Sequence, residues 1–298
     1  MSGAVDDKST AGTVDRITEP SACASRGAGG GLGERYVSGG VELRLGDWRT
    51  VLADVERVDA IISDAPYSPR THEGERGTSL AGVKEANYNP GSGAGDRTRN
   101  GIDYEPITPE MCAEFVRLWA PRTDHWAVIF GDDVSFAWWR DAWRERGWVV
   151  FAPVVWVKSN PPPRFAGDGP TSSCEYICVA RPRRKVPDSG GRPGHYSVLT
   201  QMNRGGNDMG GFVGVKDLGG MQALVRDYSR PGERIVDPFA GTGTTLVAAG
   251  IEGRECIGAE ISPETYARGL ARLRAGWTQT LRGPSVVEPK QMPLAGAR

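Results

Sequence analysis

The order of apolar and polar residues divides the chain into short runs of strand character and longer segments of helical period. Alternating or continuously apolar runs predict strands at residues 41–45, 58–63, 126–130, 149–157, 175–180, a run ending at 237, and 255–259. Helical spacing predicts helices at residues 51–55, 108–118, 217–228 and 244–250, one between Asp132 or Asp133 and Gly147, and one from Ser262. Strands that alternate with helices are typical of an α/β fold, with a mostly parallel sheet and helices on both faces.

Four segments lack this periodicity. Residues 1–38, rich in Gly, Ser, Ala and Asp, are predicted to form a disordered tail, and residues 276–298 a second tail. Residues 39–275 between them are expected to form one domain. Inside it, residues 68–103 are Gly-rich and charged, and residues 181–215 are basic. Long loops in compact domains are usually functional flaps or disordered insertions.

Local signals mark the starts of two helices and the buried face of a third. Thr108-Pro-Glu and Ser262-Pro-Glu each offer a capping hydroxyl, a proline at the first helical position and an acid in the first turn. Phe136, Trp139 and Trp143 share one face of the helix predicted between Asp132 or Asp133 and Gly147, so we expect them to pack in the core.

Composition and charge exclude some classes of protein. The 298 residues are 39% hydrophobic with a formal net charge of −1, so any nucleic-acid surface must be local. The sequence has no apolar run long enough to cross a bilayer and no signal-peptide core, so we expect a cytoplasmic protein. The five cysteines are scattered, and Cys174 and Cys178 lack a second Cys or His pair; we therefore expect free thiols and no zinc site.

A strand, a glycine turn and a helix follow one another in Asp237-Pro-Phe-Ala-Gly-Thr-Gly-Thr-Thr245. Gly241 and Gly243 can take positive φ and let a ligand approach the backbone, as in a nucleotide site. Glu260, at the end of the next strand, suits the hydroxyls of a ribose. This pattern alone is open between a nicotinamide enzyme and an S-adenosylmethionine (SAM) enzyme, although the third glycine of the nicotinamide motif is absent.

A second motif, Ser63-Asp-Ala-Pro-Tyr-Ser68, follows a buried strand directly. Its Asp64-Ala-Pro-Tyr67 resembles the Asp-Pro-Pro-Tyr catalytic motif of the DNA methyltransferases that act on adenine N6 or cytosine N4. The glycine turn resembles the SAM loop of the same family. The catalytic motif precedes the SAM loop in the chain, which is the order of the β-class enzymes.

Three further segments support the resemblance, which covers about residues 41–275. Gly258-Ala-Glu260 and the helix after it are similar to the next family motif. Asp47, upstream of the catalytic strand, is similar to the acid that holds the SAM adenine. Val155-Trp-Val-Lys158, followed by Asn160-Pro, is similar to a later strand. The resemblance implies the Rossmann-like fold of SAM-dependent methyltransferases.

The resemblance also implies a site in two parts. The catalytic wall would consist of Asp64, Ala65, Pro66 and Tyr67. The groups that bind SAM would be Asp47, Asp237, Pro238, Phe239, Gly241, Gly243, Thr244 and Glu260, with Lys216 at the methionine carboxylate. No metal is expected.

The chemistry accounts for the residue types in the catalytic motif. An exocyclic amino nitrogen is a poor nucleophile because its lone pair is delocalised into the ring. The Asp64 carboxylate can accept one of its hydrogens and the Ala65 carbonyl the other, which aims the lone pair at the methyl group. Tyr67 offers a ring on which a flipped base can stack.

Two positions depart from the family pattern. Ala65 replaces the first proline, which keeps the carbonyl but loses a fixed φ, and Asp217 stands where a proline usually follows the lysine. Aspartate in the catalytic motif is commoner among adenine enzymes and serine among cytosine enzymes, so Asp64 favours adenine N6 in double-stranded DNA. Cytosine N4, an RNA or protein amide, and a catalytically weakened DNA-binding protein stay open as alternatives.

DNA contacts are expected from the two aperiodic segments. Residues 68–103 follow the catalytic tyrosine and can close over DNA, while residues 181–215 occupy the place of the family's target-recognition region. The candidate contacts are Arg70, His72, Arg97, Arg99, Arg183, Arg184, Lys185, Arg192 and Arg204. If the two motifs form a single site, the sheet must bring the segments near residues 64 and 240 to adjacent strand ends.

Overall fold

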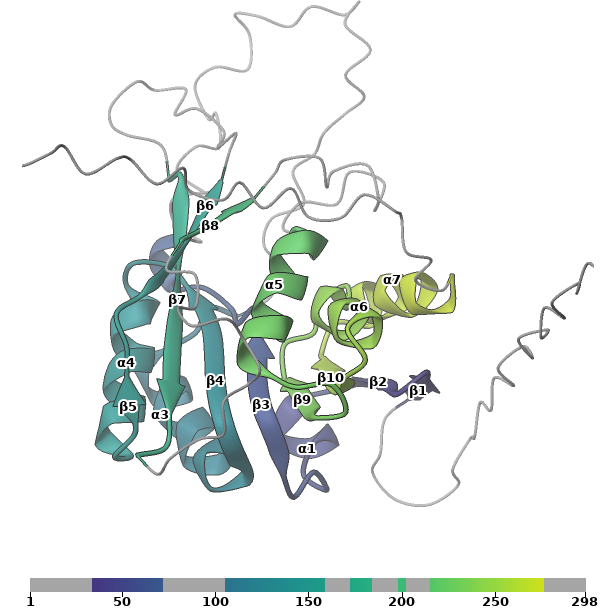
Figure 1. The fold of residues 1–298 in the computed structure, drawn as a ribbon, viewed down its shortest axis with the longest axis horizontal. Coiled ribbons are helices and arrows are strands. Elements are labelled where there is room, and N and C mark those ends of the chain that lie inside the picture. The colour runs from purple at the N-terminus through teal and green to yellow at the C-terminus, as the bar shows by residue number, and fades with distance from the viewer. Residues whose placement is uncertain (1–33, 72–104, 159–171, 184–197, 202–214, 276–298) are drawn as a thin grey trace, which may run out of the picture.

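A computed structural model describes residues 34–71, 105–158, 172–183, 198–201 and 215–275, which form strands and helices around one sheet (Figure 1). The strands are β1 (Arg35–Ser38), β2 (Val41–Leu45), β3 (Val58–Ser63), β4 (Thr123–Gly131), β5 (Val149–Val150), β6 (Val154–Lys158), β7 (Cys174–Arg181), β8 (Val198–Gln201), β9 (Arg234–Asp237) and β10 (Glu255–Glu260). The helices are α1 (Trp48–Val51), α3 (Pro109–Trp119), the 3-10 turn η1 (Ala120–Arg122), α4 (Ser135–Glu145), α5 (Leu218–Tyr228), α6 (Thr244–Ile251) and α7 (Pro263–Arg274).

The strand order is β1-β2-β10-β9-β3-β4-β7-β6-β8, with β5 paired to β7. The strands β2, β10, β9, β3 and β4 run parallel to one another. By contrast, β1 and β7 run antiparallel to their neighbours β2 and β4. The α/β class is confirmed, although the outer strands make the sheet more mixed than expected. The carboxyl ends of the five parallel strands meet at one edge, which is where open α/β sheets bind ligands.

Helices cover both faces of the sheet, as the sequence predicts. The helices α5, α6 and α7, green to yellow in Figure 1, pack against one face, and α1, α3 and α4 against the other. Ile62 belongs to the first apolar cluster and its neighbour Ile61 to the second, because successive strand residues point to opposite faces. Trp139 and Trp143 are fully buried in the second cluster, which confirms their predicted place in the core.

The two predicted helix starts are confirmed. Thr108 Oγ1 accepts a 3.2 Å hydrogen bond from Met111 N at the start of α3. Ser262 Oγ accepts a 3.3 Å hydrogen bond from Thr265 N at the start of α7. Among the helices described, none is long and apolar enough to cross a membrane.

Regular structure begins earlier than predicted, because Arg35–Ser38, which were assigned to the disordered tail, form β1. This strand pairs with β2 through a turn at Gly39 (φ 57°) and Gly40 (φ 82°). Two-residue hairpin turns favour glycine because they need positive φ. Four residues carry too little alternation to be recognised alone, so the pairing with β2 decides their conformation.

Three other elements differ from the prediction. The helix expected at residues 51–55 is α1, which begins earlier because the Asp47 carboxylate accepts from Arg49 N at 2.7 Å. The strand expected at residues 149–157 is divided into β5 and β6, with Pro153, which lacks an N–H to donate, between them. Part of the basic segment forms β8, which pairs with β6. Residues 1–33 of the predicted tail, most of the expected flap, most of the rest of the basic segment and residues 276–298 lie outside the described residues.

Candidate cofactor and catalytic site

The two sequence motifs meet at the carboxyl ends of adjacent strands. The strands β3 and β9 are parallel neighbours, with Ile61 opposite Val236. At their ends, Ser63 Oγ donates a 2.5 Å hydrogen bond to Asp237 Oδ1. The predicted approach of the segments near residues 64 and 240 is therefore confirmed.

The glycine turn has the backbone geometry that its sequence predicts. Gly241 and Gly243 have φ values of 55° and 78°, in the left-handed region that favours glycine. A Cβ built on Gly241 would meet no atom within 4 Å, so open space lies beside the turn. The turn is fixed to β10, because Ala240 N donates to Ala259 O at 2.8 Å.

Two acids stand at the ends of the strands next to the turn. Glu260 Oε2 accepts from Gly241 N at 2.9 Å, its Oε1 accepts from Ser262 N at 2.7 Å, and burial raises the pKa of this carboxyl above its usual value. Gly46 N donates to Glu260 O at 2.8 Å, which puts Asp47 beside the end of β10. Asp47 forms a 3.2 Å ion pair with Arg49, and its side chain is 39% exposed.

The remaining turn residues are held from several sides. The Asp237 side chain is buried, and burial raises its pKa to about 6 although Ser63 opposes the rise. Phe239 N donates to Asp237 Oδ1 at 3.2 Å, and the Phe239 ring stacks on Phe115 with centroids 5.9 Å apart. Pro238 and Thr244 are buried, and Thr244 Oγ1 accepts from Arg272 at 2.8 Å.

Lys216, just before α5, joins the catalytic motif. Its Nζ lies 3.0 Å from Asp64 Oδ1 and donates a 2.9 Å hydrogen bond to the Tyr67 hydroxyl. Ala65 is buried, and within the described residues no hydrogen bond reaches its carbonyl. Pro66 and Tyr67 are half-buried. The Lys216 amine thus engages Asp64, and its expected contact with the methionine carboxylate stays a prediction.

Glu175 completes this network and was not identified from the sequence. It lies in β7, is only 5% exposed, and places Oε2 2.9 Å from Lys216 Nζ. Its other oxygen, Oε1, lies 2.7 Å from Nζ of Lys158. Glu175 is opposite Trp156 across the β6–β7 ladder. The signal that could have identified Glu175 from the sequence was an acid inside an otherwise apolar, buried strand.

The charges in this network set one another's ionisation. Burial raises the pKa of Asp64, while Lys216 opposes the rise and Glu175 adds to it. Burial alone would lower the pKa of Lys216, but Asp64 and Glu175 hold it above its ordinary value. Burial opposes ionisation of Glu175 as well, yet Lys216 and Lys158 lower its pKa to about 2. The lysine at position 216 is thus a buried cation between two carboxylates.

Asp132, at the end of β4, fixes the chain that leaves the catalytic motif. Its Oδ2 accepts from Ser68 N at 3.1 Å, from Ser68 Oγ at 2.5 Å and from Thr71 Oγ1 at 2.7 Å. Its Oδ1 accepts from Ser135 N at 2.7 Å, so Asp132, one of the two predicted caps, binds the first residue of α4, although Val134 occupies the N-cap position. Burial opposes ionisation here, but these hydrogen bonds lower the pKa of Asp132 below its usual value.

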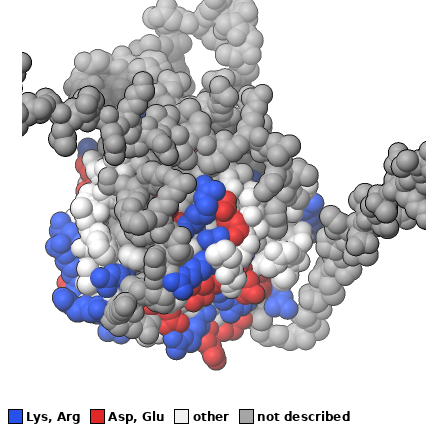
Figure 2. Space-filling view, in the orientation of Figure 1, with Lys and Arg blue, Asp and Glu red and all other residues white. Residues whose placement is uncertain are grey.

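The candidate DNA contacts divide into three groups. Arg70 is 64% exposed, close to the catalytic motif, and forms an ion pair with Asp133. Arg183 follows β7, which runs antiparallel to β4, so it lies at the sheet edge opposite Asp64, where its Nε donates to Gly147 O at 3.0 Å. That position does not support a contact near the target base. The others, His72, Arg97, Arg99, Arg184, Lys185, Arg192 and Arg204, lie outside the described residues. Basic and acidic side chains are interspersed on the described part of the face in Figure 2.

Known proteins are similar to this chain in sequence. Residues 205–271 match the DNA methylase family model. Type II methyltransferase M.SmaI of Serratia marcescens is 30% identical over 183 residues, 58% of this chain and 57% of the relative. Type II methyltransferase M.Cfr9I of Citrobacter freundii is 27% identical over 164 residues, 48% of this chain and 51% of the relative. The chain thus spans about half the length of these curated relatives.

Solved structures share the fold. The crystal structure of the M1.HpyAVI–SAM complex superposes with a TM-score of 0.56 and 21% identity, over 78% of this chain and 98% of that one. The cytosine-N4-specific PvuII DNA methyltransferase superposes with a TM-score of 0.53 and 13% identity, over 81% and 88%. The family match over residues 205–271, the partial matches to type II methyltransferases and the shared fold thus make the chain similar to N6/N4 DNA methylases.

Proposed function

We propose that the protein is a SAM-dependent DNA methyltransferase that methylates an exocyclic amino nitrogen, adenine N6 in double-stranded DNA. The observation that carries this proposal is the hydrogen bond between Ser63 and Asp237, which joins the catalytic motif to the glycine turn. A methyl donor on one motif and an amino acceptor on the other would lie next to each other. Holding two reactants in line supplies much of the rate of such a transfer.

The groups around the glycine turn fit SAM. Open space beside Gly241 allows a ligand to approach the backbone, and the Glu260 carboxylate stands at the turn where ribose hydroxyls would donate to it. Asp47, at the end of the next strand, would hold the adenine. The SAM complex of the similarly folded M1.HpyAVI supports the same choice of cofactor. Bound SAM supplies the electrophilic methyl group.

The catalytic motif would prepare the acceptor nitrogen. The Asp64 carboxylate accepts one amino hydrogen, the Ala65 carbonyl accepts the other, and the lone pair is then free to attack. As the nitrogen gains a methyl group it must lose one proton, and Asp64 is the nearest anionic acceptor. Its 3.0 Å ion pair with Lys216 favours the ionised carboxylate that this step requires.

Lys216 and Glu175 would act as positioning residues. Lys216 Nζ lies within 3.0 Å of Asp64, Glu175 and the Tyr67 hydroxyl, so one ammonium group orients both the acceptor and the stacking ring. Glu175 holds that ammonium group from the opposite side. Without Glu175, the lysine would be free to rotate away from Asp64.

The choice of adenine as the target base rests on Asp64 and on the resemblance. Relatives and neighbours include both types: a DNA adenine methyltransferase, YhdJ of Escherichia coli, is 42% identical over 53 residues, and PvuII methyltransferase is cytosine-N4-specific. Cytosine N4 is therefore the second candidate. A weakened DNA-binding protein is the third, because Ala65 replaces the family proline.

Contacts to DNA would come from Arg70 and from the other basic residues predicted within residues 68–103 and 184–215. A protein that methylates cellular DNA would act in the cytoplasm. Methylation-aware sequencing of DNA from cells that express the protein tests the proposal and gives base and recognition site together. We expect N6-methyladenine at one short sequence, absent from cells that express Asp64→Ala. An unchanged methylome would exclude the proposed activity in cells.

A further inference from the structure

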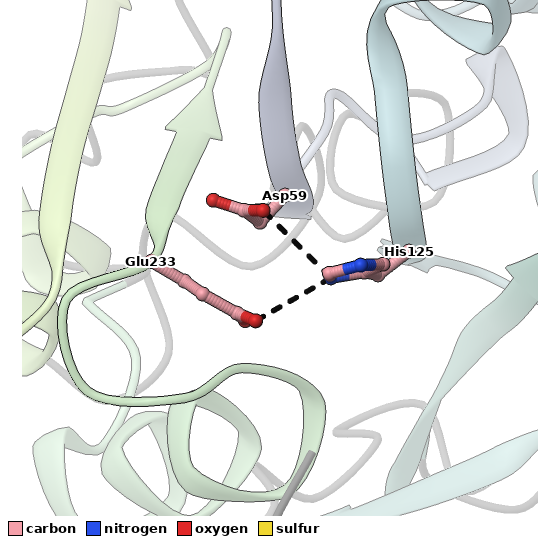
Figure 3. Close-up of side chains that lie close together, drawn as sticks. All are labelled: Asp59, His125 and Glu233. Carbon is pink, nitrogen blue, oxygen red and sulfur yellow. Dashed lines mark ion pairs between the residues drawn. The ribbon is translucent and has the colours of Figure 1, made fainter. Parts of the chain in front are cut away.

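Three side chains with metal-ligand chemistry meet at the sheet edge opposite the catalytic motif (Figure 3). Asp59 is the second residue of β3, five positions before the catalytic aspartate, and His125 lies in the first part of β4. Glu233 directly precedes β9. None of the three takes part in the proposed transfer, so their association needs a separate account.

The spacing of these groups is too long for hydrogen bonds and suits a shared ion. His125 Nδ1 lies 3.8 Å from Asp59 Oδ1 and 3.5 Å from Glu233 Oε1. Hydrogen bonds between such atoms span roughly 2.7–3.2 Å. An ion roughly 2.1 Å from each ligand atom separates neighbouring ligand atoms by roughly 3.0–3.4 Å. The ligand atoms lie within 4.8 Å of one another, so small side-chain movements would close the site around an ion.

Backbone groups hold both carboxylates in place. Asp59 Oδ2 accepts from Arg234 N at 2.8 Å, and Glu233 Oε2 accepts from Arg230 N at 2.8 Å. Each acid therefore has one oxygen fixed by the chain while the other faces the imidazole. This is the outer-shell support that metal-binding carboxylates have in known sites. The three side chains are 17–29% exposed, so the site is firm and still reachable from solvent.

We propose that Asp59, His125 and Glu233 bind a divalent transition-metal ion, preferentially Zn²⁺. One imidazole and two carboxylates form a donor set that Zn²⁺ accepts, with water at the remaining position. The ligands come from β3, β4 and the chain entering β9, so the ion would tie three central strands together at the edge away from the chemistry. The ion would act on the stability of the sheet and not on methyl transfer, so this inference goes beyond the proposed function.

Metal binding by the full-length, tag-free protein tests this proposal after chelator treatment and dialysis. Calorimetry with Zn²⁺ should give one ion per chain with a micromolar or lower dissociation constant, and Zn²⁺ should raise the thermal midpoint. Co²⁺ should give the absorption of nitrogen and oxygen ligands without the near-ultraviolet band of thiolate ligands. Mg²⁺, which prefers all-oxygen octahedral sites, should bind far more weakly.

Substitutions distinguish Zn²⁺ binding at this site from Zn²⁺ binding by other histidines and acids. His125→Gln should weaken Zn²⁺ binding by more than the roughly 10- to 100-fold that outer-shell changes cause. Glu233→Gln, whose amide oxygen can still accept from Arg230 N, should do the same without disturbing the fold. His195→Gln is the matched control and should bind as the wild type does.

Three outcomes would overturn the proposal. They are no stoichiometric binding by the wild-type protein, equal binding by His125→Gln, or a thiolate band that assigns the ion to cysteines.

Discussion

Ser63 and Asp237 are 174 positions apart in the chain, yet their side chains share a 2.5 Å hydrogen bond across adjacent parallel strands. Each stands one position from a functional segment: Asp64 follows Ser63, and the glycine turn follows Asp237. The bond fixes the distance between the proposed methyl acceptor and the proposed cofactor loop. Burial of the Asp237 carboxylate raises its pKa to about 6, although the hydrogen bond from Ser63 opposes the rise.

That pKa predicts a pH-dependent contribution to stability. A folded-state pKa of about 6 against an ordinary 3.8 means that the folded protein keeps a proton that the unfolded chain releases. The contribution is full below about pH 4, is lost as the pH rises through about 6, and amounts to about 3 kcal/mol at most. Urea unfolding at pH 4 and pH 7 should show this loss in the wild type, whereas Asp237→Asn should lack it. A constant difference between the two proteins over that range would contradict the assignment.

The Asp64 carboxylate should be required for transfer and dispensable for cofactor binding. Asp64→Ala should abolish methyl transfer, because the amino group loses its anionic acceptor, and should change SAM affinity by no more than a few-fold. Asp141→Ala, an exposed aspartate paired with Arg140 on α4, is the matched control and should keep full activity. Loss of both transfer and SAM binding in Asp64→Ala would show that the role of Asp64 is wrong.

Lys216 and Glu175 should shift the acid limb of the activity profile in opposite directions. Asp64 acts as the carboxylate, so activity falls as the pH drops through its burial-raised pKa. Lys216→Met removes the charge that opposes the rise and should move the limb to higher pH. Glu175→Gln removes a like charge and should move it to lower pH. Profiles of kcat against pH distinguish these shifts from a purely structural role of the two residues. In that case the acid limb of each variant would stay where it is in the wild type.

Removal of the buried cation should also cost stability. Lys216 is 9% exposed and faces two carboxylates, so Lys216→Met leaves Asp64 and Glu175 without the charge between them. The cost of breaking a buried pair from one side is about 3–5 kcal/mol. Glu175→Gln should cost less, because Lys216 keeps Asp64 and Lys158 can turn to solvent. Chemical denaturation measures both, and equal costs would contradict this account of the network.

Gly258 should control the cofactor turn through packing. A Cβ at this position would lie 2.7 Å from Leu246 Cδ1 and 2.8 Å from Ala240 Cβ, closer than real contacts. Gly258→Ala should displace the turn and weaken SAM binding, at a cost in stability of about 1–3 kcal/mol. Gly147→Ala is the control: its φ of 79° strains the variant, but the position lies after α4, away from the turn. Similar SAM affinities in the two variants would contradict the prediction.

The parts of the fold governed by local signals were predictable from the sequence. The strand at residues 58–63 and the starts of α3 and α7 were predicted correctly, because apolar runs, capping hydroxyls and prolines act over a few residues. The requirement that the two motifs form one site also predicted that β3 and β9 end side by side. These patterns nearly suffice to predict the strands and helices that position the site.

What the sequence did not reveal depends on contacts between distant segments. Glu175, Lys158 and Lys216 meet only because β7 turns back between β4 and β6, and no local pattern carries that pairing. Strand β1 exists through its ladder with β2, and the Asp59–His125–Glu233 cluster through the register of three strands. Arg183 was grouped with the DNA contacts because residues 181–215 occupy the place of the family's target-recognition region, whereas the direction of β7 carries it to the opposite edge.

The most direct test of the central claim is transfer of labelled methyl groups from SAM to mixed-sequence double-stranded DNA, followed by hydrolysis to nucleosides. We predict that the label appears in N6-methyladenine, and that Asp64→Ala gives none. Label in N4-methylcytosine would keep the chemistry and correct the base. Label in neither nucleoside, from a protein that still binds SAM, would contradict the account.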